Sequence, residues 1–197
     1  MMRVLPAENY RRMPWKNGGG ETTEIAVSPE GATVDSFDWR LSMATVASGG
    51  PFSTFADIDR TLAVLDGDGL RLTVEGMGTT ELMTGSAPQP FPGDAPTGAE
   101  LIGGTVIDLN IMTRRGRMSH AMRRLDISGT VDIAVAAPEL LVFCQRGTCR
   151  LRADDKTAAL GPLDTAHLDR TPQALRIETD ATARIFLIEL SPDARAR

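Results

Sequence analysis

Hydrophobic residues along this 197-residue chain gather in short runs, separated by clusters of Gly, Pro, Asp and Asn. Short apolar and β-branched runs bounded by turn formers are typical of strands. Seven runs fit this description: Thr22–Val27, Asp38–Val46, Thr61–Leu65, Leu70–Val74, Thr105–Ile111, Leu140–Cys144 and Arg184–Leu190. The 19 Gly and 12 Pro leave few windows for a long helix, so the pattern predicts an all-β fold, a sandwich or a barrel.

Polar and apolar residues alternate within the second of these strands. Because successive side chains of a strand point to opposite faces, Arg40 and Ser42 share one face. Trp39, Leu41 and Met43 share the other. A cation and a hydroxyl are unusual in a core, so the first face predicts one wall of a polar pocket. On a later strand Asp108 and Asn110 fall on one face by the same rule, which predicts a second polar wall.

The basic segment Met112–Arg124 holds five Arg residues. It is either a solvated connection, or it brings Arg114 or Arg115 to the pocket, where a guanidinium can bind a carboxylate through two hydrogen bonds. We expect Arg40 to be the main anion-binding group instead, because it projects into the barrel. A buried guanidinium needs an anionic partner, and for Arg40 this partner is either a ligand or Asp108.

Two separate matches at one offset indicate an internal duplication. The segment Leu62–Leu72 can be laid on Leu141–Leu151, and Val106–Ile111 on Ile185–Leu190, each at an offset of 79 residues. Repetition at a fixed offset predicts two related barrels, which we expect to span residues 1–115 and 116–197. Within the first barrel, the Pro- and Gly-rich segment Gly85–Gly98 is expected to be a surface loop.

Composition narrows the class of function. The net charge of −5 does not favour nucleic acid, whose binding draws on many basic residues. No run approaches the roughly 18 apolar residues of a membrane helix, and the first 13 residues do not resemble a secretory signal. With only two Cys, a disulfide framework is not expected. We therefore expect a cytoplasmic protein, and the sequence leaves room for a homodimer.

The spacing of several motifs argues against the chemistry that their residues suggest. The glycines of Trp15–Gly20 lead into a β-rich run, whereas a phosphate-binding loop leads into a helix. Catalytic zinc or iron sites commonly use two or three His, and this chain has only His120 and His167, far apart in sequence. Cys144 and Cys149 fit neither a redox pair nor a zinc site. We expect neither a bound metal nor a cofactor.

Aromatic and hydroxyl residues suggest the rest of a small-molecule pocket. Ser53 lies between Phe52 and Phe55 and is not part of a Gly-x-Ser-x-Gly motif, so it is interpreted as a hydrogen-bonding group in an apolar wall. Trp15 and Asn17 could line the same cavity from their glycine turn.

The same segments resemble the HutD/Ves family. The resemblance is carried, in chain order, by Trp15–Ile25, Phe37–Ala44, Gly50–Phe55, Asp59-Arg60 and Asp108–Gly116. It implies a bicupin, two cupin barrels in one chain, and an association with histidine utilisation. The family often has Pro-Gly after the second Phe of its Phe-Ser-x-Phe segment. Here Ala-Asp follows Phe55, so the loop that leads to Arg60 is expected to differ.

The sequence thus predicts a metal-free pocket in the N-terminal barrel that binds a small carboxylate, such as urocanate or formylglutamate, for an accessory or regulatory role in amino-acid catabolism. The expected ligand-binding residues are Trp15, Asn17, Arg40, Ser42, Phe52, Ser53, Phe55, Arg60, Asp108, Asn110 and Arg114. One alternative is a metal-independent isomerase or hydrolase, whose base would be Glu21, Glu24 or Asp108 with a raised pKa. Another is a protein that binds only a macromolecular partner.

Overall fold

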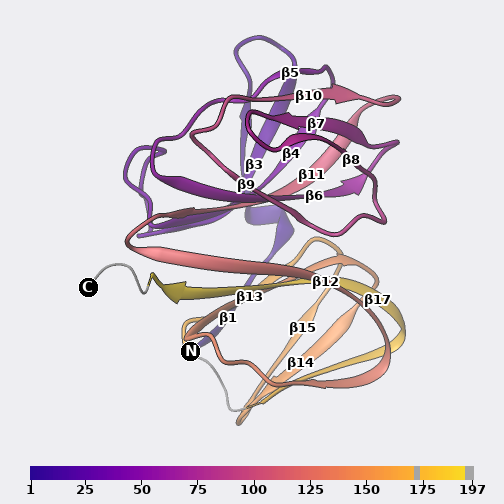
Figure 1. Ribbon diagram of the computed structural model, residues 1–197. Helices are drawn as coiled ribbons and strands as arrows, with labels where there is room; N and C mark the ends of the chain where they lie inside the picture. Colours follow the sequence, from indigo (N-terminus) through magenta and orange to yellow (C-terminus); the bar gives the residue numbers. More distant parts are fainter. Residues whose placement is uncertain (171–173, 194–197) are drawn as a thin grey trace. The chain divides into compact units, whose positions relative to one another are not determined.

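The computed structural model describes residues 1–170 and 174–193. Within these residues the chain is almost entirely β-structure, with one short 3-10 helix, η1 (Ala7–Asn9). It divides into two compact units. The N-terminal barrel comprises residues 11–119 and Asp193, and the C-terminal barrel comprises residues 1–10 and 120–192. The expected all-β bicupin is confirmed (Figure 1).

The N-terminal barrel consists of a six-stranded and a four-stranded sheet. Its strands are β2 (Arg11–Pro14), β3 (Gly20–Ser28), β4 (Trp39–Val46), β5 (Gly50–Pro51), β6 (Ile58–Asp66), β7 (Leu70–Val74), β8 (Gly78–Leu82), β9 (Gln89–Pro92), β10 (Thr97–Leu101) and β11 (Val106–Arg114). The larger sheet has the order β2-β3-β4-β11-β6-β9, and the smaller one β5-β10-β7-β8. Both strands with a predicted polar face, β4 and β11, are therefore central and adjacent.

The C-terminal barrel is built on a seven-stranded sheet. Its strands are β1 (Met2–Leu5), β12 (Met118–Ile133), β13 (Glu139–Arg146), β14 (Cys149–Ala153), β15 (Lys156–Leu160), β16 (Thr165–Leu168) and β17 (Leu175–Pro192). The sheet order is β1-β16-β13-β17-β14-β15, and the long strand β12 also pairs with β17 (Figure 1). Aliphatic side chains fill the interior, including Leu140, Val142, Leu151 and Leu187, each with no exposed surface.

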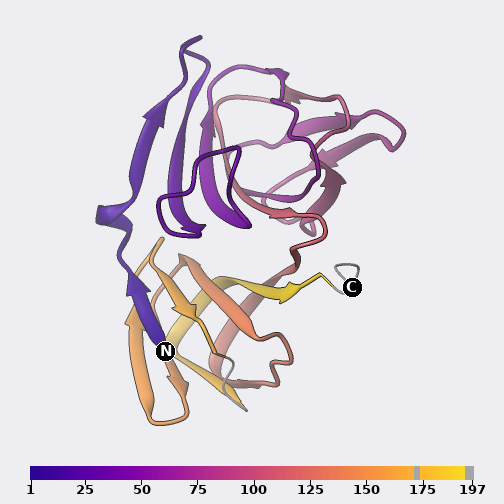
Figure 2. The same ribbon diagram turned by 90° about the vertical axis from the view of Figure 1, so that its left-hand side faces the viewer.

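The first ten residues do not belong to the N-terminal barrel, which was expected to span residues 1–115. Strand β1 pairs antiparallel with β16, so the first ten residues belong to the C-terminal barrel (Figure 2). Tyr10 fixes this attachment, because its hydroxyl lies 2.8 Å from both the Leu163 carbonyl oxygen and Thr165 Oγ1. The polar edge of β16 needs a partner strand, and a segment distant in sequence provides it.

The two predicted hairpins, β6–β7 and β13–β14, are equivalent in the two barrels. Each has a bulge in its first strand, and each turn contains a Gly at positive φ, Gly67 or Gly147. The residue alignment differs from the sequence-based one in the first strand only, where Leu62 corresponds to Val142 rather than to Leu141. A one-residue shift exchanges the two faces of a strand, and only this alignment keeps both residues in a barrel core. In the second strand Leu72 corresponds to Leu151, as expected.

The segment Gly85–Gly98 is not simply the surface loop that was expected. It contains β9, which pairs with β6 and buries Phe91 at 4% exposure. Pro90 and Pro92 are tolerated because β9 is the last strand of its sheet and needs no donors on its outer side.

Candidate functional site

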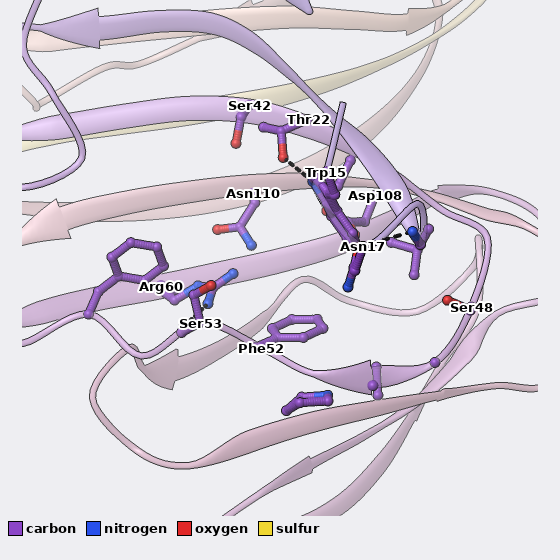
Figure 3. A pocket seen from close by; sticks show the side chains of 18 of the residues that line it. Trp15, Asn17, Thr22, Ser42, Ser48, Phe52, Ser53, Arg60, Asp108 and Asn110 are labelled. Carbon is purple, nitrogen blue, oxygen red and sulfur yellow. Dashed lines mark hydrogen bonds between the residues drawn. The ribbon is translucent and has the colours of Figure 1, made fainter. Parts of the chain in front are cut away.

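A cavity of about 550 Å³ lies in the N-terminal barrel, between side chains of both its sheets. Figure 3 shows Arg60, Ser53 and Phe52 at one end of the cavity and Trp15 with Asn17 toward the other. Ten of the eleven residues expected at the site line it: Trp15, Asn17, Arg40, Ser42, Phe52, Ser53, Phe55, Arg60, Asp108 and Asn110. The exception is Arg114.

Strands β4 and β11 form the polar wall. Their antiparallel register sets Asn110 directly opposite Ser42 and Asp108 opposite Ala44. All four residues line the cavity, as the alternation along each strand predicts. Asn110 is 5% exposed, and its Oδ1 has no hydrogen-bond partner among the described residues. A buried polar group without a partner costs free energy, and it is common where a ligand or water completes the site.

Arg40 already has a protein partner. Its Nε donates a hydrogen bond of 2.7 Å to Glu24 Oε2, and the two side chains are 8% and 17% exposed. Glu24 lies on β3, next to β4 in the sheet. The internal partner of Arg40 is therefore Glu24 and not Asp108, which leaves Arg40 largely neutralised.

Arg60 on β6 has much weaker partners. It is 6% exposed, its Nη1 lies 3.5 Å from the Ser53 carbonyl oxygen, and its Nε has no partner among the described residues. Three aromatic rings surround its guanidinium, with Cζ 5.1 Å from the Phe52 centroid, 5.7 Å from Phe55 and 5.0 Å from Phe91. The pKa of Arg60 is lowered to about 10, mainly by burial, with nearby Asp108 acting in the opposite direction and Arg40 adding to the decrease. The group remains charged at neutral pH.

Asp108 is the second buried charge of the cavity. It is 2% exposed, and its Oδ1 lacks a hydrogen-bond partner in the described part of the chain. Burial raises the pKa of Asp108 from 3.8 to about 7, although the positive charge of Arg60 acts in the opposite direction. Near neutral pH this carboxyl group can therefore hold or release a proton.

The glycine turn between β2 and β3 forms the Trp15 side of the cavity. The Trp15 indole Nε1 donates to Thr22 Oγ1 at 2.8 Å, and Asn17 Oδ1 accepts the Gly19 N–H at 3.0 Å (Figure 3). A Cβ atom at Gly20 would meet the Thr45 carbonyl oxygen and lie 3.0 Å from the Trp15 ring. Glycine is required here because the backbone approaches both groups closely.

The expectation that Arg114 reaches the cavity is wrong. Its Nε donates to the Phe37 carbonyl oxygen at 2.9 Å and its Nη2 to that of Asp35 at 3.0 Å, and it lies over the Phe37 ring. Arg115 binds a carboxylate through two hydrogen bonds, but the carboxylate is that of Asp94. The alternation along β11 puts Arg114 on the face of Asp108 and Asn110, but backbone carbonyls at the end of the strand hold its guanidinium.

Other chemically competent residues lie outside this cavity. In the C-terminal barrel His167 Nε2 lies 2.6 Å from Glu139 Oε1, and Cys144 and Cys149 are buried, unbridged thiols in the core. Across residues 1–170 and 174–193, no three His, Cys, Asp or Glu side chains cluster as metal ligands would. The same residues include no helix long and apolar enough to cross a membrane.

The roles of three residues beside the site were not identified from the sequence, which indicated Glu24 only as a candidate base. Thr22 holds the Trp15 indole and Glu24 neutralises Arg40, and alternation along β3 sets them on one face, a signal that was available. Phe91 had no such signal, because it lies between two prolines in a segment typical of a loop.

Comparisons with known proteins support the family resemblance noted in the sequence. A family model described as HutD matches residues 7–187. The chain is 35% identical over 190 residues to an uncharacterized 21.2 kDa protein in the hutC 3' region of Pseudomonas putida, which covers 96% of this chain and 97% of that protein.

Two solved structures extend the comparison to the fold. A conserved protein of unknown function from Pseudomonas aeruginosa PAO1 superposes with a TM-score of 0.91 at 32% identity, covering 97% of this chain and 99% of that one. HutD from Pseudomonas fluorescens SBW25, described for a formate condition, gives a TM-score of 0.81 at 31% identity, covering 98% and 100%.

Proposed function

This chain belongs to the HutD family, and we propose that its N-terminal barrel binds a small organic carboxylate without a metal, as an accessory or regulatory protein of histidine catabolism. The family is associated with the histidine-utilisation locus. Urocanate and formylglutamate, both small carboxylates of that pathway, are the candidate ligands. The observation that carries the proposal is Arg60, a buried cation that lines the cavity and lacks a full set of partners.

Charge balance supports an anionic ligand. Glu24 offsets Arg40 through a direct hydrogen bond, whereas Asp108, whose pKa is raised to about 7, is partly protonated near neutral pH and offsets Arg60 only in part. No direct hydrogen bond joins these two side chains, and each keeps one buried polar atom without a partner in the described residues. A ligand carboxylate at Arg60 would supply the missing acceptor, and charge-assisted hydrogen bonds of this kind are the strong ones. We assign the main anion contact to Arg60 and a secondary role to Arg40.

The apolar part of the lining suits the rest of such a ligand. Trp15, Phe52, Phe55 and Met112 contribute rings and a thioether around the polar groups. Small-molecule sites typically combine an apolar lining with a few convergent polar groups. The cavity of about 550 Å³ also falls within the usual size range of ligand pockets, about 300–1,000 Å³.

A second candidate function is favoured by Asp108. With a pKa of about 7 and a position in the cavity wall, it could accept a proton from a bound carboxylic substrate, as the base of an isomerase or hydrolase. Glu24 is less suited to this role, because Arg40 already binds its carboxylate.

Calorimetry and thermal melts with urocanate and formylglutamate test the proposal on three proteins: the natural chain, Arg60→Gln and Arg71→Gln. Arg71 is an exposed residue paired with Glu81 on β8, so it controls for the loss of one positive charge. A ligand at a hundredfold excess over Kd should stabilise the natural protein by about 2.7 kcal/mol. Arg60→Gln should bind at least about tenfold more weakly, a loss of about 1.4 kcal/mol, and Arg71→Gln should bind normally.

The ligand that binds is then incubated with the protein and followed by proton NMR. Binding without conversion supports the accessory role, whereas conversion that is lost in Asp108→Asn supports the enzyme. If neither compound binds between pH 6 and 8, the proposed ligand class is refuted.

A further inference from the structure

We propose that the proline-rich segment Gln89–Thr97 positions the Arg60 guanidinium for its anion, and that Phe91 is the positioning residue. The inference rests on the proposed role of Arg60 in the cavity. It assigns a function to the segment that the sequence indicates is a loop, and it involves no new contact with the ligand.

Phe91 supports Arg60 from outside the cavity. The two residues are direct partners in the antiparallel pairing of β6 with β9, and the Arg60 Cζ lies 5.0 Å from the Phe91 ring centroid. This is the shortest of the three distances to rings around Arg60. Phe91 is 4% exposed and is not part of the cavity lining. Its ring therefore acts on the ligand only through the residues it packs against in the lining, Arg60 and Phe52.

The same segment also holds the other two rings. The Phe52 N–H donates to the Thr97 carbonyl oxygen at 2.8 Å, and the Phe55 N–H donates to the Gly93 carbonyl oxygen, also at 2.8 Å. The rings of Phe52 and Phe91 pack at 6.5 Å between centroids, tilted by 54°. All three aromatic residues around the guanidinium thus depend on one segment for their position.

Gly93 fits this segment closely against β6. Its N–H donates to the Ile58 carbonyl oxygen at 2.7 Å. A Cβ atom at Gly93 would lie 2.9 Å from that oxygen and 3.2 Å from Arg60 Cδ. Any larger residue would therefore push the segment away from the aliphatic part of Arg60.

Arg115 anchors the segment at its far side. Its Nη1 and Nη2 bind the Asp94 carboxylate at 2.6 and 2.9 Å, while its Nε donates to Asp59 Oδ1 at 2.7 Å. Asp94 follows β9 and Asp59 lies on β6, so Arg115 ties the two together. Arg115, which the sequence suggested as a possible contact to the ligand, therefore binds carboxylates of the protein instead.

The physical consequence is a guanidinium that is fixed but not neutralised. An aromatic face attracts a cation through its quadrupole, and carries no charge that would compete with an incoming carboxylate. A protein carboxylate in the same place would hold Arg60 equally well but would occupy its donors. The aromatic surroundings therefore keep Arg60 both oriented and available.

The test replaces Phe91 by Leu and, separately, by phenylalanines with increasing ring fluorination, which weakens the quadrupole while the ring shape is nearly kept. Phe143→Leu is the matched control. Phe143 is fully buried in the C-terminal barrel and packs on Phe186 at 6.4 Å and 50°, nearly the geometry of the Phe52–Phe91 pair. Two quantities are measured: the Kd for urocanate and formylglutamate, and the order parameter of the Arg60 Nε–H signal by nitrogen-15 NMR, assigned with Arg60→Lys.

We expect Phe91→Leu to bind about fivefold more weakly and to lower the Arg60 order parameter, with a graded loss along the fluorinated series. Phe143→Leu should lower stability and leave both quantities unchanged. An Arg60 signal that is insensitive to all changes at Phe91 would overturn the inference. The NMR measurement needs no ligand, so a failure of both compounds to bind would count against the proposed function and leave the role of Phe91 to be decided by the order parameter.

Discussion

Replacement of Asp108 by Asn should change how the stability of the N-terminal barrel depends on pH. In the folded protein the pKa of Asp108 is about 7, against an ordinary value of 3.8, because the side chain is buried. Between these two values the folded state binds more protons than the unfolded state. The free energy of unfolding therefore falls as pH rises from about 4 to about 7, and the loss is complete above pH 7.

The size of the effect follows from the two pKa values. Integration of the proton linkage between pH 5 and pH 8 gives a loss of about 2.5 kcal/mol from this one group. Asp108→Asn cannot ionise, so it should lack this loss. The difference in unfolding free energy between the variant and the natural protein should then shift in favour of the variant by about 2.5 kcal/mol between pH 5 and pH 8.

Urea unfolding followed by tryptophan fluorescence measures this quantity. Both Trp residues, Trp15 and Trp39, lie in the N-terminal barrel, so the signal reports the unit that contains Asp108. Asp94→Asn, in the same barrel, is the control. The Arg115 hydrogen bond lowers the pKa of Asp94, so its titration lies below this pH range and the curve of the variant should run parallel to that of the natural protein. An Asp108→Asn curve parallel to that of the natural protein from pH 5 to 8 would refute the reasoning.

Three further substitutions test the remaining assignments. Arg114→Ala should leave carboxylate affinity unchanged and lower stability by about 2 kcal/mol in urea unfolding, through the lost hydrogen bonds to backbone carbonyls. Glu24→Gln should tighten binding of either carboxylate in calorimetry, because Arg40 loses its counter-charge, and should cost about 2 kcal/mol of stability. Gly20→Ala should destabilise the N-terminal barrel by about 1–3 kcal/mol, since its Cβ has no room beside the Thr45 carbonyl and the Trp15 ring. Normal stability of this last variant, measured by tryptophan fluorescence, would contradict the close packing of the turn.

Local periodicity determined the all-β fold and much of the candidate cavity. The alternation of apolar and polar residues fixes which side chains share a face, and the same rule that puts Arg40 with Ser42 also puts Asp108 with Asn110. Adjacent pairing of β4 and β11 then brings these two faces together. The repeated strand-turn-strand pattern similarly revealed the duplication, because each hairpin is encoded within a short stretch of chain.

Tertiary structure alone decided which partner each charge obtained. Glu24, rather than Asp108, neutralises Arg40, and this depends on the register of β3 against β4. The sequence likewise does not show that Asp94 occupies Arg115, since the two residues meet through a loop contact 21 positions apart. Strand pairing over long sequence separations sets these distances, and no local pattern records it.

Two further differences between the expectations from sequence and the structure also arise from strand pairing between distant segments. The attachment of the first ten residues to the C-terminal barrel satisfies the edge of β16, a requirement that exists only once that sheet has formed. Phe91 is buried because the edge of β6 can accept a short strand despite its prolines, which propensity alone disfavours. Sequence patterns therefore determine the faces of individual strands, whereas edges, registers and charge partners are properties of the assembled sheets.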